Sequence, residues 1–378
     1  MSLILDEHRE LLSDVPRLRA FEAALNETVR AGHVVLDLGA GTGILGLLAC
    51  RAGARRVYSL DDGGMIQVAR EIGRANRLQD RITYVKGLST RIDLPEQVDV
   101  VVADQIGHFG FEAGLVQYFA DARTRLLKPG GILIPARVDL CVAPVEVPQM
   151  WDQIEFWKAS VVGFDATPGF PVAINTGYPV KLNANQLVGP PATLAVIDLS
   201  TQVSELITGD VTVIAERDGI LHGIGGWFCA QLSKNVQMTN GPSSGRAIKR
   251  RNAYFPIDRP IQLQKGDRVR IAMSIRSADL IVTWAVGVSA PDGTKKADFR
   301  HSTWRGMLLC SEDLAKTRAD YIPRLSPWGG ARRSVLELCD GRTVTEIEKE
   351  IRIRHADLFS SPAAAAQFVG EVLIPYSL

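Results

Sequence analysis

The sequence predicts an α/β domain with a parallel sheet, followed by a β-rich domain and a small helical module. Runs of strand and helix character alternate over residues 34–145, strand-like runs dominate 166–310, and the last segment repeats apolar residues at helical spacing. Such alternation is typical of a parallel sheet with helices on both faces. A chain of 378 residues suits two or three domains. We expect domain boundaries at 1–145, 146–325 and 326–378.

The first expected strand, 34–38, leads into a glycine-rich turn. It carries Asp37 and is followed by glycines at alternate positions, Gly39, Gly41 and Gly43. Residues 45–53 then read as a short helix that ends in a glycine. Glycines at such a turn let the backbone approach a ligand closely. In this class of fold, ligands bind beyond the carboxyl ends of the strands.

The second expected strand, 57–61, ends in Asp61, eighteen residues after Gly43. A carboxylate there can accept hydrogen bonds from both hydroxyls of a ribose. The glycine spacing differs from the G-x-G-x-x-G of dinucleotide sites, and no P-loop lysine follows. D-x-G-x-G-x-G with a later strand-end acid is typical of S-adenosylmethionine sites. We therefore expect that cofactor in a seven-stranded Rossmann-like methyltransferase domain. The alternative is a glycine turn that only packs helix on strand.

Further strands and helices complete the expected α/β domain. Helices are expected within 6–31, at 63–76 and at 113–127, and strands at 82–86, 98–103 and 132–136. The third strand is followed by candidate cofactor-binding residues Gly87, Ser89 and Thr90. The fourth is followed by two acids and a histidine, Asp104, His108 and Glu112. These three side chains lie at the edge where a methyl donor would point.

Composition narrows the function classes. Lysine plus arginine total 43 and aspartate plus glutamate 42, so no bulk charge favours nucleic acid or a membrane surface. The five cysteines are scattered without C-x-x-C or metal-ligand spacing, which favours reduced thiols in a cytoplasmic protein without a metal site. The acidic N-terminus argues against a secretory signal, and no apolar run approaches the roughly 20 residues of a membrane span.

Several short segments, taken in order, resemble the protein arginine methyltransferases. Residues 8–17 are similar to the family's H-E-x-x-L-x-D-x-x-R helix, and 75–78 read Ala-Asn-Arg-Leu as in the family. Lys86-Gly87 and the Asp-Leu-Pro of 93–95 follow. Residues 104–112 lie on the family's S-E-W-M-G-Y-x-L-x-x-E loop, which carries two glutamates. The resemblance covers roughly residues 6–290.

The resemblance implies a site and an assembly. It adds His8 and Arg17 to the cofactor-binding residues, with Arg17 pairing with the donor carboxylate. It makes Asp104 and Glu112 the catalytic pair that orients an acceptor guanidinium. It also implies a β-barrel and a homodimer, in which an arm at 166–192 rests on the partner.

The chain departs from the family pattern on the acceptor side. Asp104 replaces the first loop glutamate and Gln105 the loop tryptophan. The family's T-H-W triplet corresponds to Ile-Lys-Arg, so Lys249 and Arg250 become substrate-binding candidates together with His108. The two cations either pair with the loop acids or bind an anionic acceptor.

Three functions therefore stay open. The first is N-methylation of a guanidine or arginine-type group in a peptide, a protein or a small molecule. The second is methylation of an oxygen or a non-guanidine nitrogen in a natural-product-type small molecule. The third is a degenerate protein that binds the cofactor or a peptide without turnover.

The remaining sequence predicts a barrel or sandwich and then helices. Strand-like runs lie at 193–199, 211–215, 219–232, 262–273 and 280–288. Residues 326–330 read as a linker. Residues 331–347 read as helix, turn, helix, and resemble the winged-helix module of PqqD-like peptide-recognition proteins; a plain helical cap is the alternative.

Overall fold

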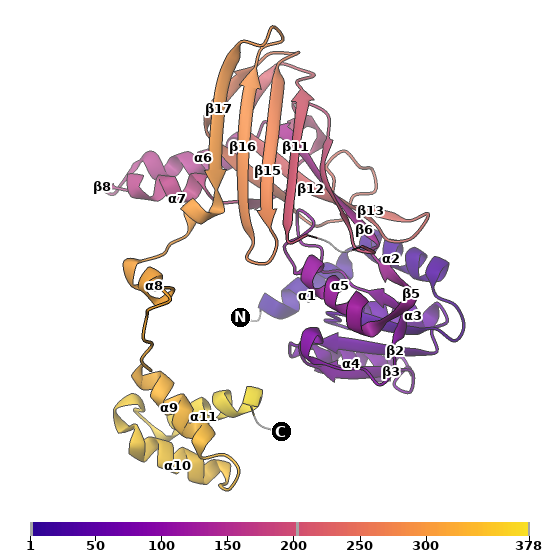
Figure 1. The fold of residues 1–378 in the computed structure, drawn as a ribbon, viewed down its shortest axis with the longest axis vertical. Coiled ribbons are helices and arrows are strands. Elements are labelled where there is room, and N and C mark those ends of the chain that lie inside the picture. Colours follow the sequence, from indigo (N-terminus) through magenta and orange to yellow (C-terminus); the bar gives the residue numbers. More distant parts are fainter. Residues whose placement is uncertain (1–2, 202–203, 377–378) are drawn as a thin grey trace. The chain divides into compact units, whose positions relative to one another are not determined.

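The first domain of the computed structural model, which describes residues 3–201 and 204–376, contains a parallel sheet in the order β3-β2-β1-β4-β5 (Figure 1). Its strands are β1 Val34–Leu38, β2 Arg56–Asp61, β3 Ile82–Lys86, β4 Val98–Val102 and β5 Leu127–Ile134. The α/β class is confirmed, but this sheet has five strands and not the expected seven. After β5 the chain enters β6 (Arg137–Val145), which pairs with strands of the next domain.

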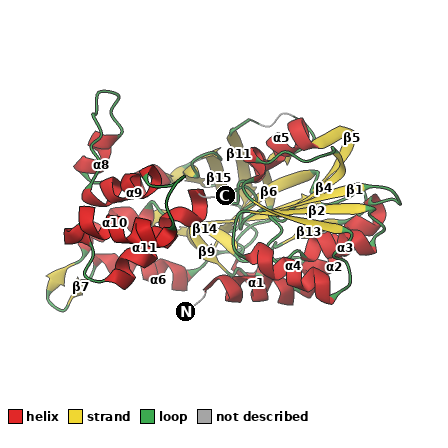
Figure 2. Ribbon diagram, turned by 90° about the horizontal axis from the view of Figure 1, so that it is seen from below, coloured by secondary structure: helices red, strands yellow, loops and turns green. Residues whose placement is uncertain are grey.

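Helices cover both faces of this sheet, with α2, α3 and α4 on one side and α5 on the other (Figure 2). The helices of this domain are α1 Leu3–Ser13, α2 Val15–Thr28, α3 Ile44–Arg51, α4 Met65–Ala75 and α5 Leu115–Asp121. The expected helix at 113–127 is shorter, because α5 passes into a π-helical turn, Ala122–Leu126. Asp14 caps α2 by accepting from the Arg17 amide at 3.4 Å, and Pro16 occupies its first turn.

The second domain consists of two antiparallel sheets, as expected for a barrel-like fold. One follows the order β10-β6-β12-β14-β9, with β13 on β12, and the other β11-β15-β16-β17. Their strands are β9 Tyr178–Val180, β10 Ala192–Asp198, β11 Leu206–Ile214, β12 Gly219–Gln231, β13 Gln237–Thr239, β14 Asn252–Leu263, β15 Arg268–Arg276, β16 Ile281–Ser289 and β17 Lys295–Ser302. The buried Trp284 indole donates to the Pro256 carbonyl at 2.7 Å and so ties the two sheets together.

One expectation about this domain needs correction. The run 262–273 is not one strand: it covers the end of β14, a turn with Gly266 at φ +94°, and the start of β15. The alternating apolar pattern continues through the turn, which hides the break. Because β6 pairs with β10 and β12, we propose that the second domain begins after residue 136.

A segment of short elements stands out from the barrel-like domain (Figure 1). It comprises α6 Pro148–Glu155, β7 Ser160–Val161, β8 Phe164–Asp165 and α7 Phe170–Ile174. It thus starts before the expected arm at 166–192, whose later part contains the sheet strand β9. Its tip is apolar and exposed, with Val162 at 91% and Phe164 at 77% exposure.

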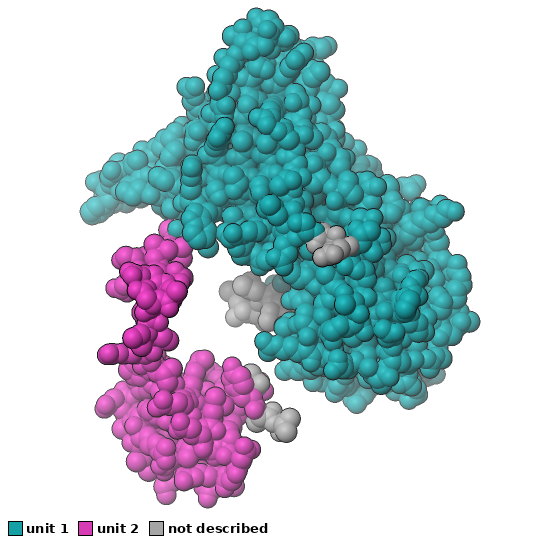
Figure 3. Space-filling view, in the orientation of Figure 1, with its two compact units in different colours: residues 1–307 teal, residues 308–378 magenta. Residues whose placement is uncertain are grey.

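The chain divides into two compact units, Met1–Met307 and Leu308–Leu378 (Figure 3). The second contains α8 Ser311–Lys316, α9 Pro327–Glu337, α10 Val344–Arg354 and α11 Pro362–Tyr376. The last three pack around Val335, Ile351 and Val369. No strand occurs in residues 308–376, so the wing of the expected winged helix is missing there and the plain helical alternative fits. Within the described residues of the whole chain, no helix has both the length and the apolar character to span a bilayer.

Candidate active site

The turn after β1 forms a cradle that only glycine fits. Gly39 and Gly41 have φ of +68° and +53°. A Cβ on Gly41 would lie 2.6 Å from the imidazole of His8, and one on Gly39 would lie 2.2 Å from the Nε2 atom of Gln105. The backbone here is therefore open to a ligand that replaces these two side chains.

Asp61, at the end of β2, is oriented by two backbone amides. Its Oδ2 accepts from the Gly41 amide at 2.8 Å, and its Oδ1 accepts from the Gly63 amide at 2.8 Å. Each carboxylate oxygen keeps a second lone pair. Asp61 can therefore accept two further hydrogen bonds, which is what a ribose diol requires.

A pocket of about 40 Å³ lies between the ends of β1, β2, β3 and β4. It is lined by Leu38, Gly39, Leu60, Asp61, Asp62, Gly87, Leu88, Ser89, Gln105 and Tyr118. The Oε1 atom of Gln105 is buried there and has no hydrogen-bond partner among the described residues. The cradle, the diol acceptor and this orphaned oxygen fit an adenosine-containing ligand. The present volume is far smaller, so Gln105 and His8 must move aside to admit it.

Other cofactor candidates lie around this pocket but do not line it. Asp37 is fully buried beneath the turn and accepts from the Gly46 amide at 2.9 Å and the Ser59 hydroxyl at 3.4 Å. Burial raises the pKa of Asp37 to about 7. Asp37 therefore holds the turn in place. Gly43 caps α3, and Thr90 is exposed in the short 3-10 helix Ser89–Arg91.

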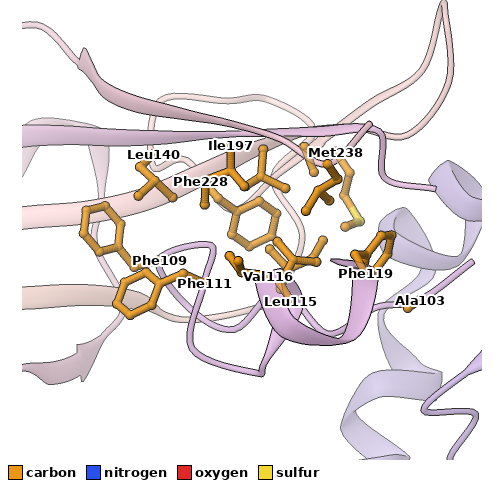
Figure 4. Close-up of a cluster of buried hydrophobic side chains, with 14 of the residues drawn as sticks. Ala103, Phe109, Phe111, Leu115, Val116, Phe119, Leu140, Ile197, Phe228 and Met238 are labelled. Carbon is orange, nitrogen blue, oxygen red and sulfur yellow. The ribbon is translucent and has the colours of Figure 1, made fainter. Parts of the chain in front are cut away.

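The loop after β4 is anchored by aromatic side chains. Phe109 and Phe111 are buried and belong to the same apolar cluster as Phe228 and Leu140 of the barrel-like domain (Figure 4). Two aromatic anchors within one short loop restrict its conformations. The loop therefore positions its two acids, one on each side of the anchors.

Asp104 forms ion pairs with two arginines. The guanidinium of Arg250 donates to its Oδ1 and Oδ2 at 3.1 and 2.7 Å, and the Nε of Arg17 donates to Oδ2. Burial would raise the pKa of Asp104, but Arg250 and Arg17 more than offset it and hold that pKa below its ordinary value. Asp104 is therefore ionised, and its charge is engaged by two cations inside the protein.

Glu112 is held by backbone amides and forms no ion pair with an arginine of the described residues. Its Oε1 accepts from the Phe109 amide at 2.8 Å, and its Oε2 accepts from the Gly110 and Phe111 amides at 3.0 and 3.2 Å. Glu112 and His108 line a pocket of about 250 Å³, whose other walls come from Phe111, residues 177–179, Ala253, Phe255, Leu280, Val282 and Thr303. Oε1 accepts fewer hydrogen bonds than Oε2, so it is the atom available to a bound group.

Lys249 and Arg250, which stand where the family has its T-H-W triplet, make different contacts. Arg250 reaches Asp104, as above, and its Nη1 also donates to the Gly107 carbonyl at 3.4 Å. Lys249 points to the junction of α1 and α2, where its ammonium donates to the Ser13 carbonyl at 3.1 Å. Its amide donates to the Asp14 carboxylate at 2.8 Å. Of the expected pairing with the loop acids, only the Arg250–Asp104 pair forms.

Sequence reasoning missed several residues here. The sequence did not indicate that Asp62, Leu88, Gln105 and Tyr118 line the pocket of about 40 Å³, which is called the donor pocket below. It also did not foresee that Arg17 lies on Asp104. The Arg17–Asp104 and Arg250–Asp104 contacts join residues that are 87 and 146 positions apart in the sequence, and no local pattern indicates them. The loss of the loop tryptophan was the one signal that pointed to Gln105.

Two family models match this chain, one over the first domain and one over the barrel-like domain. Residues 21–136 match the family model of ribosomal protein L11 methyltransferase, PrmA. Residues 136–286 match the model of the arginine methyltransferase oligomerization subdomain. The two matches meet at residue 136, between β5 and β6.

Curated relatives share most of the chain. Protein arginine N-methyltransferase 1.1 of Arabidopsis thaliana is 30% identical over 277 residues, which cover 71% of this chain and 70% of the relative. Protein arginine N-methyltransferase 1 of Schizosaccharomyces pombe is 29% identical over 286 residues, covering 72% and 82%.

Solved structures share the fold. The Trypanosoma brucei PRMT1 enzyme–prozyme heterotetrameric complex with AdoHcy superposes with a TM-score of 0.69 at 24% identity, covering 78% of this chain and 97% of the other. Protein arginine methyltransferase 10 of Arabidopsis thaliana gives a TM-score of 0.67 at 24% identity, covering 79% and 98%. On the identity and coverage of its curated relatives, this chain belongs to the protein arginine N-methyltransferase family and is an S-adenosylmethionine-dependent methyltransferase.

Proposed function

We propose that this chain methylates a guanidine nitrogen of an arginine-type group in a protein or peptide. The observation that carries the proposal is Glu112, a carboxylate fixed by three backbone amides and open to a pocket of about 250 Å³. The family of the curated relatives supports the acceptor class.

The residues of the cleft supply the binding of the donor. Asp61 would bond the ribose hydroxyls, the backbone of Gly39 and Gly41 would face the methionine portion, and Arg17 would bond the donor carboxylate. Bound S-adenosylmethionine supplies a methyl group on a sulfonium, which makes the carbon electrophilic. His8 and Gln105, which now lie on the two glycines, would then close over the bound donor.

On the acceptor side, Glu112 orients the nucleophile. A guanidinium has a pKa above about 12, so it enters protonated. Oε1 of Glu112 accepts one of its N–H groups and draws the positive charge toward that side, which leaves another nitrogen better able to attack. The N–CH₃ bond forms as the S–CH₃ bond breaks, the electron pair stays on sulfur, and the methylated nitrogen loses its proton to water. Holding both atoms near contact supplies most of the acceleration.

The test combines binding and transfer. Calorimetry with S-adenosylhomocysteine should show a saturable site at micromolar concentration. Mass spectrometry should then detect a gain of one methyl group on an arginine-containing peptide, confined to the guanidine. Donor-product binding without transfer to any arginine peptide would refute the proposed acceptor.

A second candidate acceptor is an oxygen or a non-guanidine nitrogen of a small molecule. The pairing of Asp104 with Arg17 and Arg250 favours it, because the loop then offers a guanidinium one free carboxylate and not two. Incubating the protein with labelled donor and a cell extract freed of protein, followed by mass analysis, tests this alternative. Labelled small molecules without labelled peptides would support it.

We also propose a homodimer built through the projecting segment. Its exposed apolar side chains are Phe156, Trp157, Val162 and Phe164. An open groove of about 580 Å³ between α2, α3 and the loop after α4 offers Val15, Leu18, Ile44 and Leu47 in its lining. Burial of such surfaces against one another stabilises an isologous pair.

Light scattering tests the assembly. Phe164→Asp should convert a dimer into a monomer, whereas Val196→Asp, at an exposed position of β10, should not. A wild-type monomer at micromolar concentration would refute the dimer.

A further inference from the structure

The charges at the acceptor site do not suit an ordinary arginine side chain. Arg17 and Arg250 face Asp104 and the nearby Glu112, so these four groups sum to zero. A bound donor adds a sulfonium and an ammonium against one carboxylate, and an acceptor guanidinium adds one more positive charge. When Asp61, which would bond the ribose, is also counted, the filled site would then carry one uncompensated positive charge in a partly buried environment.

Arg250 uses only part of its hydrogen-bonding capacity. Its Nη1 and Nη2 atoms hold Asp104, and Nη1 also contacts the Gly107 carbonyl. Its Nε forms no hydrogen bond with the described residues, and an arginine has five N–H donors in all. Its side chain is 11% exposed, so it is not sealed from an incoming group. The edge made by Nε and Nη2 matches the two oxygens of a carboxylate.

Gly107 lies beside Glu112 on the Nη1 side of the Arg250 guanidinium. The carbonyl of Gly107 accepts from Arg250, and its α-carbon faces Glu112 so closely that a Cβ there would lie 2.3 Å from Oε2. Gly107 has φ of +78°, a conformation that glycine adopts without strain. An acceptor on Glu112 therefore lies within one residue of Arg250.

We propose that Arg250 is a specificity-determining residue that binds a carboxylate of the acceptor while its other edge stays on Asp104. The preferred substrate is then an arginine with a carboxylate close by, either an acidic neighbour or its own free terminal carboxylate. That carboxylate compensates the excess positive charge. The inference rests on the proposed function and specifies its substrate class.

Three peptides of one parent sequence test it. The first has glycine on both sides of the arginine and an amidated end. The second has aspartate next to the arginine, and the third ends in arginine with a free carboxylate. The proteins are the wild type, Arg250→Gln, Arg250→Lys and the control Arg251→Gln, which changes an exposed neighbouring arginine. The readout is kcat/KM for each peptide, with S-adenosylhomocysteine affinity measured in parallel.

The wild type should prefer at least one carboxylate-bearing peptide by about 10-fold or more, the scale of one charge-assisted hydrogen bond. Arg250→Gln should reduce this ratio to within about 3-fold, Arg250→Lys should restore part of it, and Arg251→Gln should leave it unchanged. Which of the two peptides is preferred identifies the source of the carboxylate. Because an ion pair is screened, the wild-type preference should also shrink as salt rises, a test that needs no variant.

Two results overturn the inference in different ways. Equal kcat/KM for all three peptides, or an undiminished preference in Arg250→Gln, refutes the role of Arg250 and leaves the proposed function intact. No transfer to any peptide by a wild type that binds S-adenosylhomocysteine refutes the proposed function and this inference with it.

Discussion

The donor side and the acceptor side of this site are built in different ways. On the donor side, the backbone of one turn and one strand-end carboxylate form the binding surface, and both lie within residues 37–63. On the acceptor side, Asp104, Arg17 and Arg250 come from three distant segments and form one buried ion network. The donor turn follows the family pattern described above, whereas on the acceptor side Asp104 and Arg250 depart from that pattern and Arg17 keeps it.

This difference in construction explains why the donor side stays closer to the family pattern than the acceptor side does. A side chain on Gly39 or Gly41 would collide with Gln105 or His8, so the donor turn tolerates little change. The acceptor network tolerates exchange as long as its charges balance, because a buried charge without a partner costs several kcal/mol. The acid that keeps its backbone cradle, Glu112, is the one that also keeps the family's residue type.

The largest effect should come from Glu112→Gln. To keep the backbone amides of 109–111 bonded, the new side chain must turn its amide oxygen toward them, which presents its NH₂ group to the acceptor. Turnover should fall by about 10² or more, the scale of losing an oriented charged partner. S-adenosylhomocysteine affinity should stay within about 3-fold, since Glu112 is not in the donor pocket. A parallel loss of S-adenosylhomocysteine affinity would contradict the assignment of Glu112 to the acceptor side alone.

Asp61→Ala should produce the reverse pattern. It removes the acceptor for the ribose hydroxyls and the partner of the Gly41 and Gly63 amides. Loss of charged hydrogen bonds should weaken S-adenosylhomocysteine binding by roughly 10- to 100-fold in calorimetry. Asp80→Ala, an exposed acid outside the pocket, is the control. If Asp61→Ala binds as tightly as the wild type, the diol does not lie where we place it.

Much of the fold could be predicted from the sequence, because apolar periodicity marks β1 to β4 within one residue at each end. The donor turn was also predictable, since its spacing is local. The network around Asp104 was not, because contact between Arg17 and Asp104 depends on how α2 packs over the sheet edge. The strand count was overestimated in part for a related reason: residues 137–145 pair with strands of the second domain, and such partners are not visible in a local pattern.

A smaller effect is expected for Asp37, the buried acid beneath the glycine turn, whose role differs from that of Asp61. Burial raises the pKa of Asp37 from 3.8 to about 7, so the native state holds a proton that the unfolded chain releases. The stability this provides is present below about pH 4 and is lost as pH rises through about 7. Relative to Asp37→Asn, the wild type should lose on the order of 4 kcal/mol between these limits. Thermal melts of both proteins from pH 4 to 8 measure the gap; a constant gap would contradict the shift.

The smallest effect should come from a surface ion pair that serves neither side. Arg270 and Asp210 pair on the outside of β15 and β11, with side chains 63% and 49% exposed. Exposed pairs contribute little to stability, because water and salt screen them. Arg270→Ala should therefore shift the melting temperature by a few degrees at most. Transfer to the arginine peptides should not change, and a change would mean that the sheet β11-β15-β16-β17 communicates with the site.

The most direct test of the account is a crystal structure with S-adenosylhomocysteine and an arginine peptide that carries a neighbouring carboxylate. The account predicts Asp61 on the ribose, the peptide guanidinium on Glu112, and Arg250 bridging Asp104 and the peptide carboxylate. A peptide guanidinium seated on Asp104, with Arg250 displaced from it, would contradict the account.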